Sequence, residues 1–276
     1  MIRIYKDTNG ATLMERDREW RAVPGFSWDA LFRQSDPAAF AAEAFASGAV
    51  HEPSSGAWAA PIGNQEVWAA GVTYYRSRQA RMEESEESGG DRFYDMVYDA
   101  VRPELFFKAT AARTRGHLAH VRVRADSNWD VPEPELTLAI NSAGKVFGYT
   151  IGNDMSSRDI EGENPLYLPQ AKVYKGSCAI GPALTIADAP LPGTTVIHLE
   201  IARAGEAIFT GETAIDQIKR GFDELAGFLF TENEFPDGAY LMTGTGVVPG
   251  DGFTLQSGDV IRISIDGLGT LENSVE

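Results

Sequence analysis

The sequence has one cysteine, Cys178, among 276 residues, and no apolar run approaches the roughly 20 residues that a membrane-spanning helix needs. A single cysteine excludes a disulfide within the chain, which is typical of a cytoplasmic protein. The first residues carry no long apolar stretch with a small-residue cleavage site, so we expect no signal peptide. Small residues flank Cys178 on both sides, and we interpret its thiol as buried packing rather than as a nucleophile.

Basic side chains are also few. The 24 lysines and arginines stand against 40 acidic residues, which gives a net charge of -16 and a pI near 4.7. Nucleic acids and anionic membranes bind basic surfaces, so the charge argues against both as partners. The four histidines show no paired spacing typical of a zinc site. A hydrophobic content of 43% is that of an ordinary globular protein with a core.

The chain is predicted to form two domains, a small α+β domain over residues 1–62 and a larger, mostly β domain over residues 63–276. Prolines and glycines near residue 61 mark the boundary. In the first domain, Asp36 and Gly48 enclose a helix that begins with a proline. The glycines and prolines of the second domain favour strands folded into a sandwich or roll over a βαβ array.

The larger domain is expected to contain many short strands. One amphipathic helix should interrupt them, because apolar residues recur at helical spacing from Ile215 to Leu229. A polar segment at about 73–101, rich in arginines and acids and broken by two glycines, predicts either a lid over a cleft or a solvated loop. The main strands are expected at 67–72, 103–108, 119–124, 136–141, 146–151, 196–202, 207–210 and 260–266, and the last of them alternates cleanly between apolar and polar residues.

Two glutamates alternate with prolines in the stretch from Trp129 to Leu136. Side chains alternate faces along a strand, so Glu133 and Glu135 should project from the same side. Their like charges repel unless a cation neutralises them, which suggests a metal site or an acid/base pair. The prolines donate no ladder hydrogen bond and therefore predict an irregular or edge strand. A solvated face of such a strand is the alternative.

A third carboxylate, Asp154, follows the next strand. Three carboxylates without a nearby histidine select a hard divalent cation, Mg²⁺ or Mn²⁺, over zinc. Further along the chain stand a lysine at Lys172 and a threonine between glycines at Thr245.

Taken in order, the motifs E-P-E, G-N-D-M-S-S-R-D, A-K, G-T and L-x-x-G-D-x-I resemble the fumarylacetoacetate hydrolase family. The likeness extends from Gly71 to the C-terminus. It implies the mixed β-sandwich roll of that family, assembled as a homodimer or homotetramer. By this resemblance Glu133, Glu135 and Asp154 are metal ligands, Lys172 is a catalytic lysine, Arg158 supports the metal loop, and Thr245 contacts a substrate carboxylate.

The sequence departs from the hydrolases and decarboxylases of this family in the lid. Those enzymes carry G-x-N-Y-x-x-H-x-x-E, whereas Ser77 and Ala80 stand here at the histidine and glutamate positions. Neither side chain can act as a general base near neutral pH. In addition, Glu161 replaces an expected glutamine. These departures weigh against C–C hydrolysis. With these departures and the motif R-P-E-L-F-F-K, the sequence resembles the branch of the family that dehydrates 2-keto-3-deoxy-pentonates.

That branch implies the conversion of a small anionic 2-keto acid to 2,5-dioxopentanoate and water, with Mg²⁺ as cofactor. A divalent ion bound by the C1 carboxylate and C2 ketone would acidify the C3 protons. Lys172 would accept the proton, and Glu161, Glu163 or a water would protonate the leaving C4 hydroxyl. An acylpyruvate hydrolase or decarboxylase and a non-catalytic binding module are the alternatives. The expected substrate contacts are Ser77, Arg78, Arg81, Lys108 and Thr245.

Overall fold

The computed structural model describes residues 1–52, 54, 56–74 and 96–276. Most of the predicted lid, with Ser77, Arg78 and Arg81, therefore lies outside the described residues. Strands are the most abundant regular structure in the described chain and helices are fewer, which confirms the predicted α+β, mostly β, fold class. No helix among the described residues is long and apolar enough to cross a membrane.

Twelve strands form the larger sheet. They are β1 (Ile2–Asp7), β2 (Thr12–Arg16), β3 (Glu19–Ala22), β4 (Ala49–His51), β5 (Trp58–Ala59), β6 (Glu66–Gly71), β7 (Glu104–Thr110), β8 (Thr114–Arg115), β11 (Pro134–Ile140), β12 (Val146–Asp154), β14 (Cys178–Ile186) and β17 (Ala239–Met242). The main path runs β4-β3-β2-β1-β14-β12-β11-β17-β6-β7, with β5 paired to β1 and β8 to β14. Because β1 pairs with β14, the sheet runs across the predicted boundary at residue 62, and the division into two domains stays a prediction.

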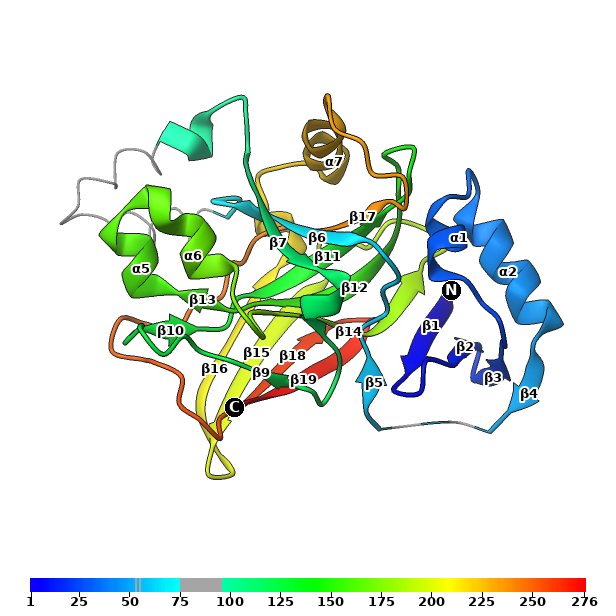
Figure 1. Ribbon diagram of the computed structural model, residues 1–276, viewed down its shortest axis with the longest axis horizontal. Coiled ribbons are helices and arrows are strands. Elements are labelled where there is room, and N and C mark those ends of the chain that lie inside the picture. Colours follow the sequence, from blue (N-terminus) through cyan, green and yellow to red (C-terminus); the bar gives the residue numbers. More distant parts are fainter. Residues whose placement is uncertain (53, 55, 75–95) are drawn as a thin grey trace.

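A second sheet of five strands has the order β16-β15-β18-β19-β9. Its members are β9 (His120–Val121), β15 (Val196–Arg203), β16 (Glu206–Ala214), β18 (Val260–Ile265) and β19 (Gly269–Val275). A short pair, β10 (Asp130–Val131) and β13 (Ser156–Ser157), lies beside the larger sheet. The two sheets lie face to face, as a sandwich requires (Figure 1).

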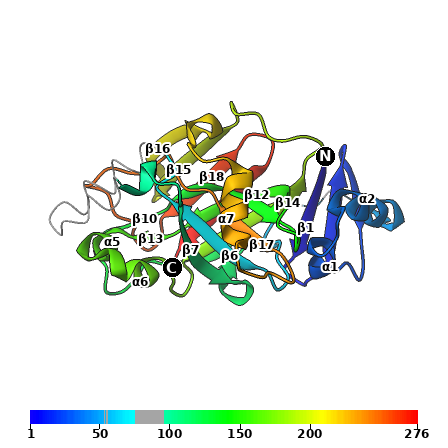
Figure 2. The ribbon, with the colours of Figure 1, turned by 90° about the horizontal axis from the view of Figure 1, so that it is seen from above.

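Short helices lie at both ends of the molecule (Figures 1 and 2). Helices α1 (Trp28–Phe32) and α2 (Pro37–Ser47) are at one end, and α5 (Arg158–Glu163) and α6 (Leu168–Lys172) at the other. The Asp36 side chain accepts a hydrogen bond from the backbone of Ala39, which confirms the predicted cap of α2. Further helices are α7 (Phe222–Phe230) and the 3₁₀ turns η1 (Ala111–Arg113), η2 (Pro165–Tyr167) and η3 (Ile215–Gln217). Residues 96–99 are helical as well.

The single amphipathic helix predicted from Ile215 to Leu229 is wrong. The stretch divides into η3 and α7, because Ile218 and Gly221 have extended backbone conformations. Ile218 also forms a bridge with Tyr74, and the Lys219 N–H donates to the Thr73 carbonyl. The apolar periodicity continues through the break because both pieces bury side chains in the same core.

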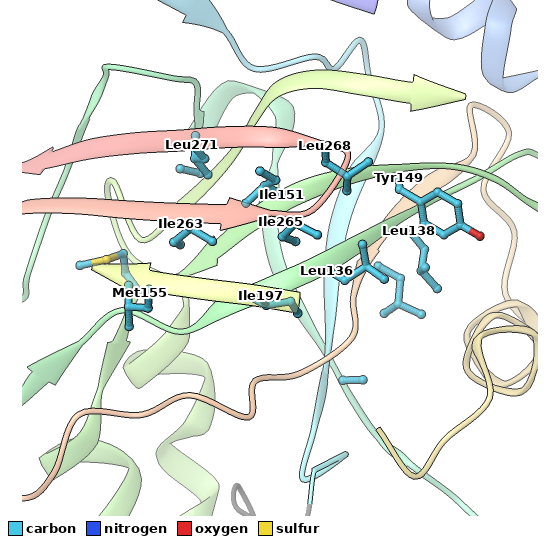
Figure 3. Packing of buried hydrophobic residues seen from close by; sticks show 14 of the residues in the cluster. Leu136, Leu138, Tyr149, Ile151, Met155, Ile197, Ile263, Ile265, Leu268 and Leu271 are labelled. Carbon is cyan, nitrogen blue, oxygen red and sulfur yellow. The ribbon is translucent and has the colours of Figure 1, made fainter. Parts of the chain in front are cut away.

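The larger sheet is buried on both faces. On one face, Leu136 and Leu138 of β11 and Ile151 of β12 pack with Ile263 and Ile265 of the second sheet (Figure 3). The alternate residues of β11 point to the opposite face, where Ala139 joins a second cluster with α1, α2 and Tyr240. Of the two alternatives that the prolines suggested, an irregular strand start or an edge strand, the edge strand is wrong, since β11 lies between β12 and β17. The start of β11 is irregular in that only β12 pairs with residues 134–136. Pro134 is tolerated because β17 pairs only with residues 137–140.

Candidate active site

The ends of β11 and β12 bring three carboxylates together. Glu133 and Asp154 exchange both backbone hydrogen bonds, at 3.2 and 3.0 Å, so they lie directly opposite each other, one residue beyond the pair Pro134 and Asn153. Glu135 follows on the same face, opposite Gly152. One oxygen from each of Glu133, Glu135 and Asp154 lies within 4.8 Å of the others. The spacing of the E-P-E motif therefore places both glutamates where alternation predicted them.

These carboxylates are nearly inaccessible, with exposures of 5%, 1% and 0% for Glu133, Glu135 and Asp154. Burial, followed by the charges of Asp154 and Glu133, raises the pKa of Glu135 well above its usual range. Burial acts in the same direction on Asp154, but the Lys108 and Lys172 ammonium groups lower its pKa below the ordinary value. Buried anions at this spacing need added positive charge, and an all-oxygen donor set fits a hard divalent cation.

Lys172, the last residue of α6, extends its fully buried side chain into this cluster. Its Nζ lies 2.8 Å from Glu133 Oε2 and 3.0 Å from Asp154 Oδ2. It also donates to Ser156 Oγ at 2.6 Å, and Glu161 Oε1 lies 3.3 Å away. The amine is thus within reach of several groups that could take or return a proton.

Helix α5 adds Arg158 and Glu161, both buried. Arg158 Nη2 donates to Glu133 Oε1 at 3.0 Å, and its Nε lies 3.8 Å from Glu161 Oε2. Helix α5 begins directly after β13, which follows the strand that ends at Asp154, so the chain passes from the carboxylate cluster to the helix within a few residues. Arg158 therefore pairs with Glu133 of the cluster and places its positive charge beside Glu161.

A small cavity opens onto this cluster, lined among others by Gly71, Phe106, Lys172, Gly244 and Thr245. The Gly244 N–H donates to Glu135 Oε2 at 2.5 Å and holds that carboxylate from the opposite side. The Thr245 hydroxyl donates to the Val247 carbonyl at 3.1 Å, so it is fixed within its own loop while lining the cavity.

Glu104 of β7 also belongs near the site, although the sequence analysis did not single it out. A Cβ placed on Gly71 would lie 2.0 Å from Glu104 Oε2, so this carboxylate lies against a residue that lines the cavity. The position of Glu104 in the R-P-E-L-F-F-K motif was the available signal. Its closeness became evident only through the pairing of Gly71 with Glu104 between β6 and β7.

Glu163, an expected proton donor, and Lys108, an expected substrate contact, lie outside the cavity lining. Glu163 is exposed at the end of α5 and is not among the residues that line the cavity. Lys108 is fully buried, yet it does not line the cavity either. Cys178 is buried as expected, and burial raises the pKa of its thiol to about 12, which makes it a poor nucleophile.

Residues 76–276 match the family described as fumarylacetoacetate (FAA) hydrolase C-terminal. A probable 2-keto-3-deoxyxylonate dehydratase of Haloferax volcanii is 50% identical over 216 residues, which are 78% of this chain and 73% of that protein. A 2-dehydro-3-deoxy-D-arabinonate dehydratase of Saccharolobus solfataricus is 44% identical over 218 residues, with the same coverage of 78% and 73%.

Solved structures agree over the whole chain. A 2-keto-3-deoxy-D-arabinonate dehydratase complexed with magnesium and 2,5-dioxopentanoate superposes with a TM-score of 0.86 at 34% identity, covering 100% of this chain and 99% of that one. A fumarylacetoacetate hydrolase from Exiguobacterium antarcticum, at 21% identity, shares the fold with a TM-score of 0.72 over 100% and 99% of the two chains. The predicted mixed β-sandwich roll is thereby confirmed.

Proposed function

Because the chain belongs to the fumarylacetoacetate hydrolase family, we propose that it converts a 2-keto-3-deoxy-pentonate to 2,5-dioxopentanoate and water with Mg²⁺ as cofactor. The chain is an enzyme of the hydro-lyase class, since relatives at 50% and 44% identity are named dehydratases. The observation that carries the proposal is the meeting of three buried carboxylates with Lys172, beside a cavity that Glu133, Asp154 and Lys172 line. An assembly of two or four copies remains a prediction.

Glu133, Glu135 and Asp154 would hold the Mg²⁺. Oxygen donors alone suit this ion, and a related dehydratase is complexed with magnesium. When bound, the ion supplies Lewis-acid polarisation of the carbonyl next to the reacting carbon. Arg158 and the Gly244 N–H keep the two glutamates in place, which limits the reorganisation needed during the reaction.

Lys172 and Glu161 can divide the proton transfers between them. Glu161 Oε1, 3.3 Å from Lys172 Nζ, can take a proton from the ammonium and leave a neutral amine. That amine accepts the C3 proton of the substrate, and protonated Glu161 gives its proton to the departing C4 hydroxyl, which leaves as water. A shift of a proton from C5 to C3 and ketonisation of the resulting C5 enol complete 2,5-dioxopentanoate.

Glu104 is a second candidate for the proton donor. Its carboxylate lies against Gly71 in the cavity wall, whereas Glu161 is held between Lys172 and Arg158. A donor beside the cavity could reach the C4 hydroxyl without passing the metal ligands. Glu163, exposed on α5, is less suited to the role.

The test is to incubate the protein with 2-keto-3-deoxy-pentonate and Mg²⁺ and to follow the products by proton NMR. The proposal expects an aldehyde signal, loss of the C4 proton signal of the alcohol, and no reaction after chelation of the metal. Acylpyruvate is the matched alternative substrate. Cleavage of acylpyruvate without formation of an aldehyde from the pentonate would contradict the dehydratase and support a C–C hydrolase.

A further inference from the structure

We propose that Lys108 is a positioning residue which fixes Asp154 and the backbone of Lys172 relative to each other, and that it does not bind substrate. This inference replaces the expectation that Lys108 contacts the substrate. It rests on the proposed metal site but is independent of which keto acid the enzyme dehydrates.

Lys108 of β7 ends in a closed set of acceptors. Its ammonium donates to the carbonyl of Met155 at 2.9 Å and to the carbonyl of Lys172 at 2.6 Å, and it forms an ion pair with Asp154 Oδ1. The two carbonyls take two of the three N–H groups of the ammonium, and the Asp154 carboxylate lies in direct ion-pair contact with it. Lys108 is also 0% exposed and does not line the cavity, so its contacts are to groups of the protein and its ammonium does not face the space where a substrate would bind.

The three acceptors come from two separate parts of the site. Asp154 and Met155 are at the end of β12, whereas Lys172 is the last residue of the five-residue helix α6. A helix this short has little stability of its own and depends on tertiary contacts. Lys108 therefore joins the metal-ligand strand to the segment that carries the proposed base.

Lys108 also decides which oxygen of Asp154 faces the cluster. Oδ1 is paired with Lys108, and Oδ2 is directed to Lys172 Nζ, 3.0 Å away. A carboxylate held by one oxygen is oriented to offer the other to a cation. In contrast to Lys172, which touches Glu133 and Glu161 as well, Lys108 contacts the three-carboxylate cluster through Asp154.

The experiment compares Lys108→Met, Lys108→Arg and the exposed control Lys145→Met. Mn²⁺ binding is measured by calorimetry without substrate, and kcat and KM are measured at saturating Mg²⁺. Because loss of an outer partner of a ligand weakens metal binding by about 10- to 100-fold, we expect at least about a tenfold loss in Lys108→Met. We also expect a lower kcat with an unchanged KM, partial rescue in Lys108→Arg, and no change in Lys145→Met.

Two results would overturn the proposal. A raised KM with unchanged Mn²⁺ affinity would make Lys108 a substrate ligand, and tighter Mn²⁺ binding would make it only a competing charge. If Lys108→Met does not fold, NMR of ¹⁵N-lysine in the unaltered chain decides, with the signal assigned from Lys108→Arg. The Lys108 ammonium signal should shift with Mg²⁺ and stay still when pyruvate is added afterwards, whereas the Lys172 signal should respond to both.

Metal binding without substrate keeps this test separate from that of the dehydratase activity. If the protein fails to dehydrate the pentonate but Lys108→Met still weakens Mn²⁺ binding, the positioning role stands and the proposed substrate falls. If the protein dehydrates the pentonate but Lys108→Met leaves Mn²⁺ affinity unchanged, the proposed substrate stands and the positioning role falls.

Discussion

Two regions of the molecule hold networks of ion pairs with nearly the same contact distances and opposite surroundings. On the outer face of the second sheet, Arg262 lies 2.6 Å from both Glu200 and Glu272, with about 40% of its side chain exposed. In the candidate active site, Lys172 lies 2.8 Å from Glu133, and its side chain is 0% exposed. The distance between charges therefore does not distinguish the two networks, whereas their exposure does.

The difference in exposure sets the energetic cost of each network. Exposed pairs remain hydrated and contribute about 0–1 kcal/mol each. Buried pairs lose hydration, and replacing them with apolar residues is often neutral or stabilising. A fold that nonetheless buries Glu133, Glu135, Asp154, Lys108 and Lys172 together has a site whose charges serve chemistry rather than stability.

The largest expected effect comes from Glu135→Gln. Removal of a proposed metal ligand should lower the rate of dehydration by more than about 100-fold, the upper range for residues that only support ligands. The folded structure should persist, because glutamine keeps the shape and can still accept from the Gly244 N–H. Activity at saturating Mg²⁺ and circular dichroism measure the two effects, and near-normal activity would show that the metal site is assigned wrongly.

Without metal, the folded Glu135→Gln variant should be more stable than the unaltered chain. Burial and the neighbouring Asp154 and Glu133 raise the pKa of Glu135, so the folded chain holds a proton more tightly than the unfolded chain. The metal-free fold therefore loses stability as pH rises from the ordinary pKa range of a glutamate toward the raised pKa of Glu135, because the unfolded chain releases this proton first. Without metal at pH 7, Glu135→Gln should melt at a higher temperature than the unaltered chain. Added Mg²⁺ should raise the melting temperature of the unaltered chain by more than it raises that of the variant.

Lys172→Met ranks second. Loss of a general base or acid typically costs about 100- to 10,000-fold in rate, and we expect kcat to fall within that range. The methionine side chain fills a similar volume, and Mg²⁺ should still bind because its three oxygen ligands remain. Exchange of the substrate C3 protons with deuterated solvent, followed by NMR, should stop in the variant. Continued exchange at the normal rate would assign the base to another residue.

Asp130 is a buried carboxylic acid that belongs to neither of the two ion-pair networks. It is 2% exposed, and its Oδ1 has no hydrogen-bond partner among the described residues. Burial raises the pKa of this carboxyl to about 6. The folded chain thus favours the neutral acid, and stability contributed by that form is lost as pH rises from about 4 to about 6.

Asp130→Asn should remove this loss. We expect the variant to gain about 1 kcal/mol in unfolding free energy at pH 7.5, after allowance for partial solvent screening, and little at pH 4. Urea unfolding at both pH values measures the difference. An equal effect at the two values would show that hydrogen bonding, rather than ionisation, governs this position.

The contrast between the networks also shows what the sequence could predict. Alternation in residues 260–266 predicted apolar Ile261, Ile263 and Ile265 on one face and polar residues on the other, and β18 has that arrangement. The same alternation placed Glu133 and Glu135 on one side. It could not show that both faces of β11 are buried, because that depends on two core clusters built from distant parts of the chain.

Local patterns were insufficient where a distant contact determines the structure. The helix predicted through Ile218 breaks because that residue bridges to Tyr74, far away in sequence. The sequence could not show which groups Lys108 contacts, since its acceptors Met155 and Lys172 become neighbours only on folding. The order of the motifs along the chain, by contrast, identified the family and the candidate metal ligands. A comparison of motif order needs no knowledge of the distances between the residues in the folded chain.

The smallest expected effect is that of Arg262→Ala on the outer face. It removes both ion pairs of Arg262, yet the unfolding free energy should fall by less than about 1 kcal/mol, because exposed pairs gain little over their hydrated partners. Dehydration should keep its normal rate, and the small loss of stability should shrink further in high salt. Arg158→Ala is the matched change in the buried network, where it leaves Glu133 with one cation fewer. If urea unfolding gave equal losses for the two variants, exposure would not be what separates these networks.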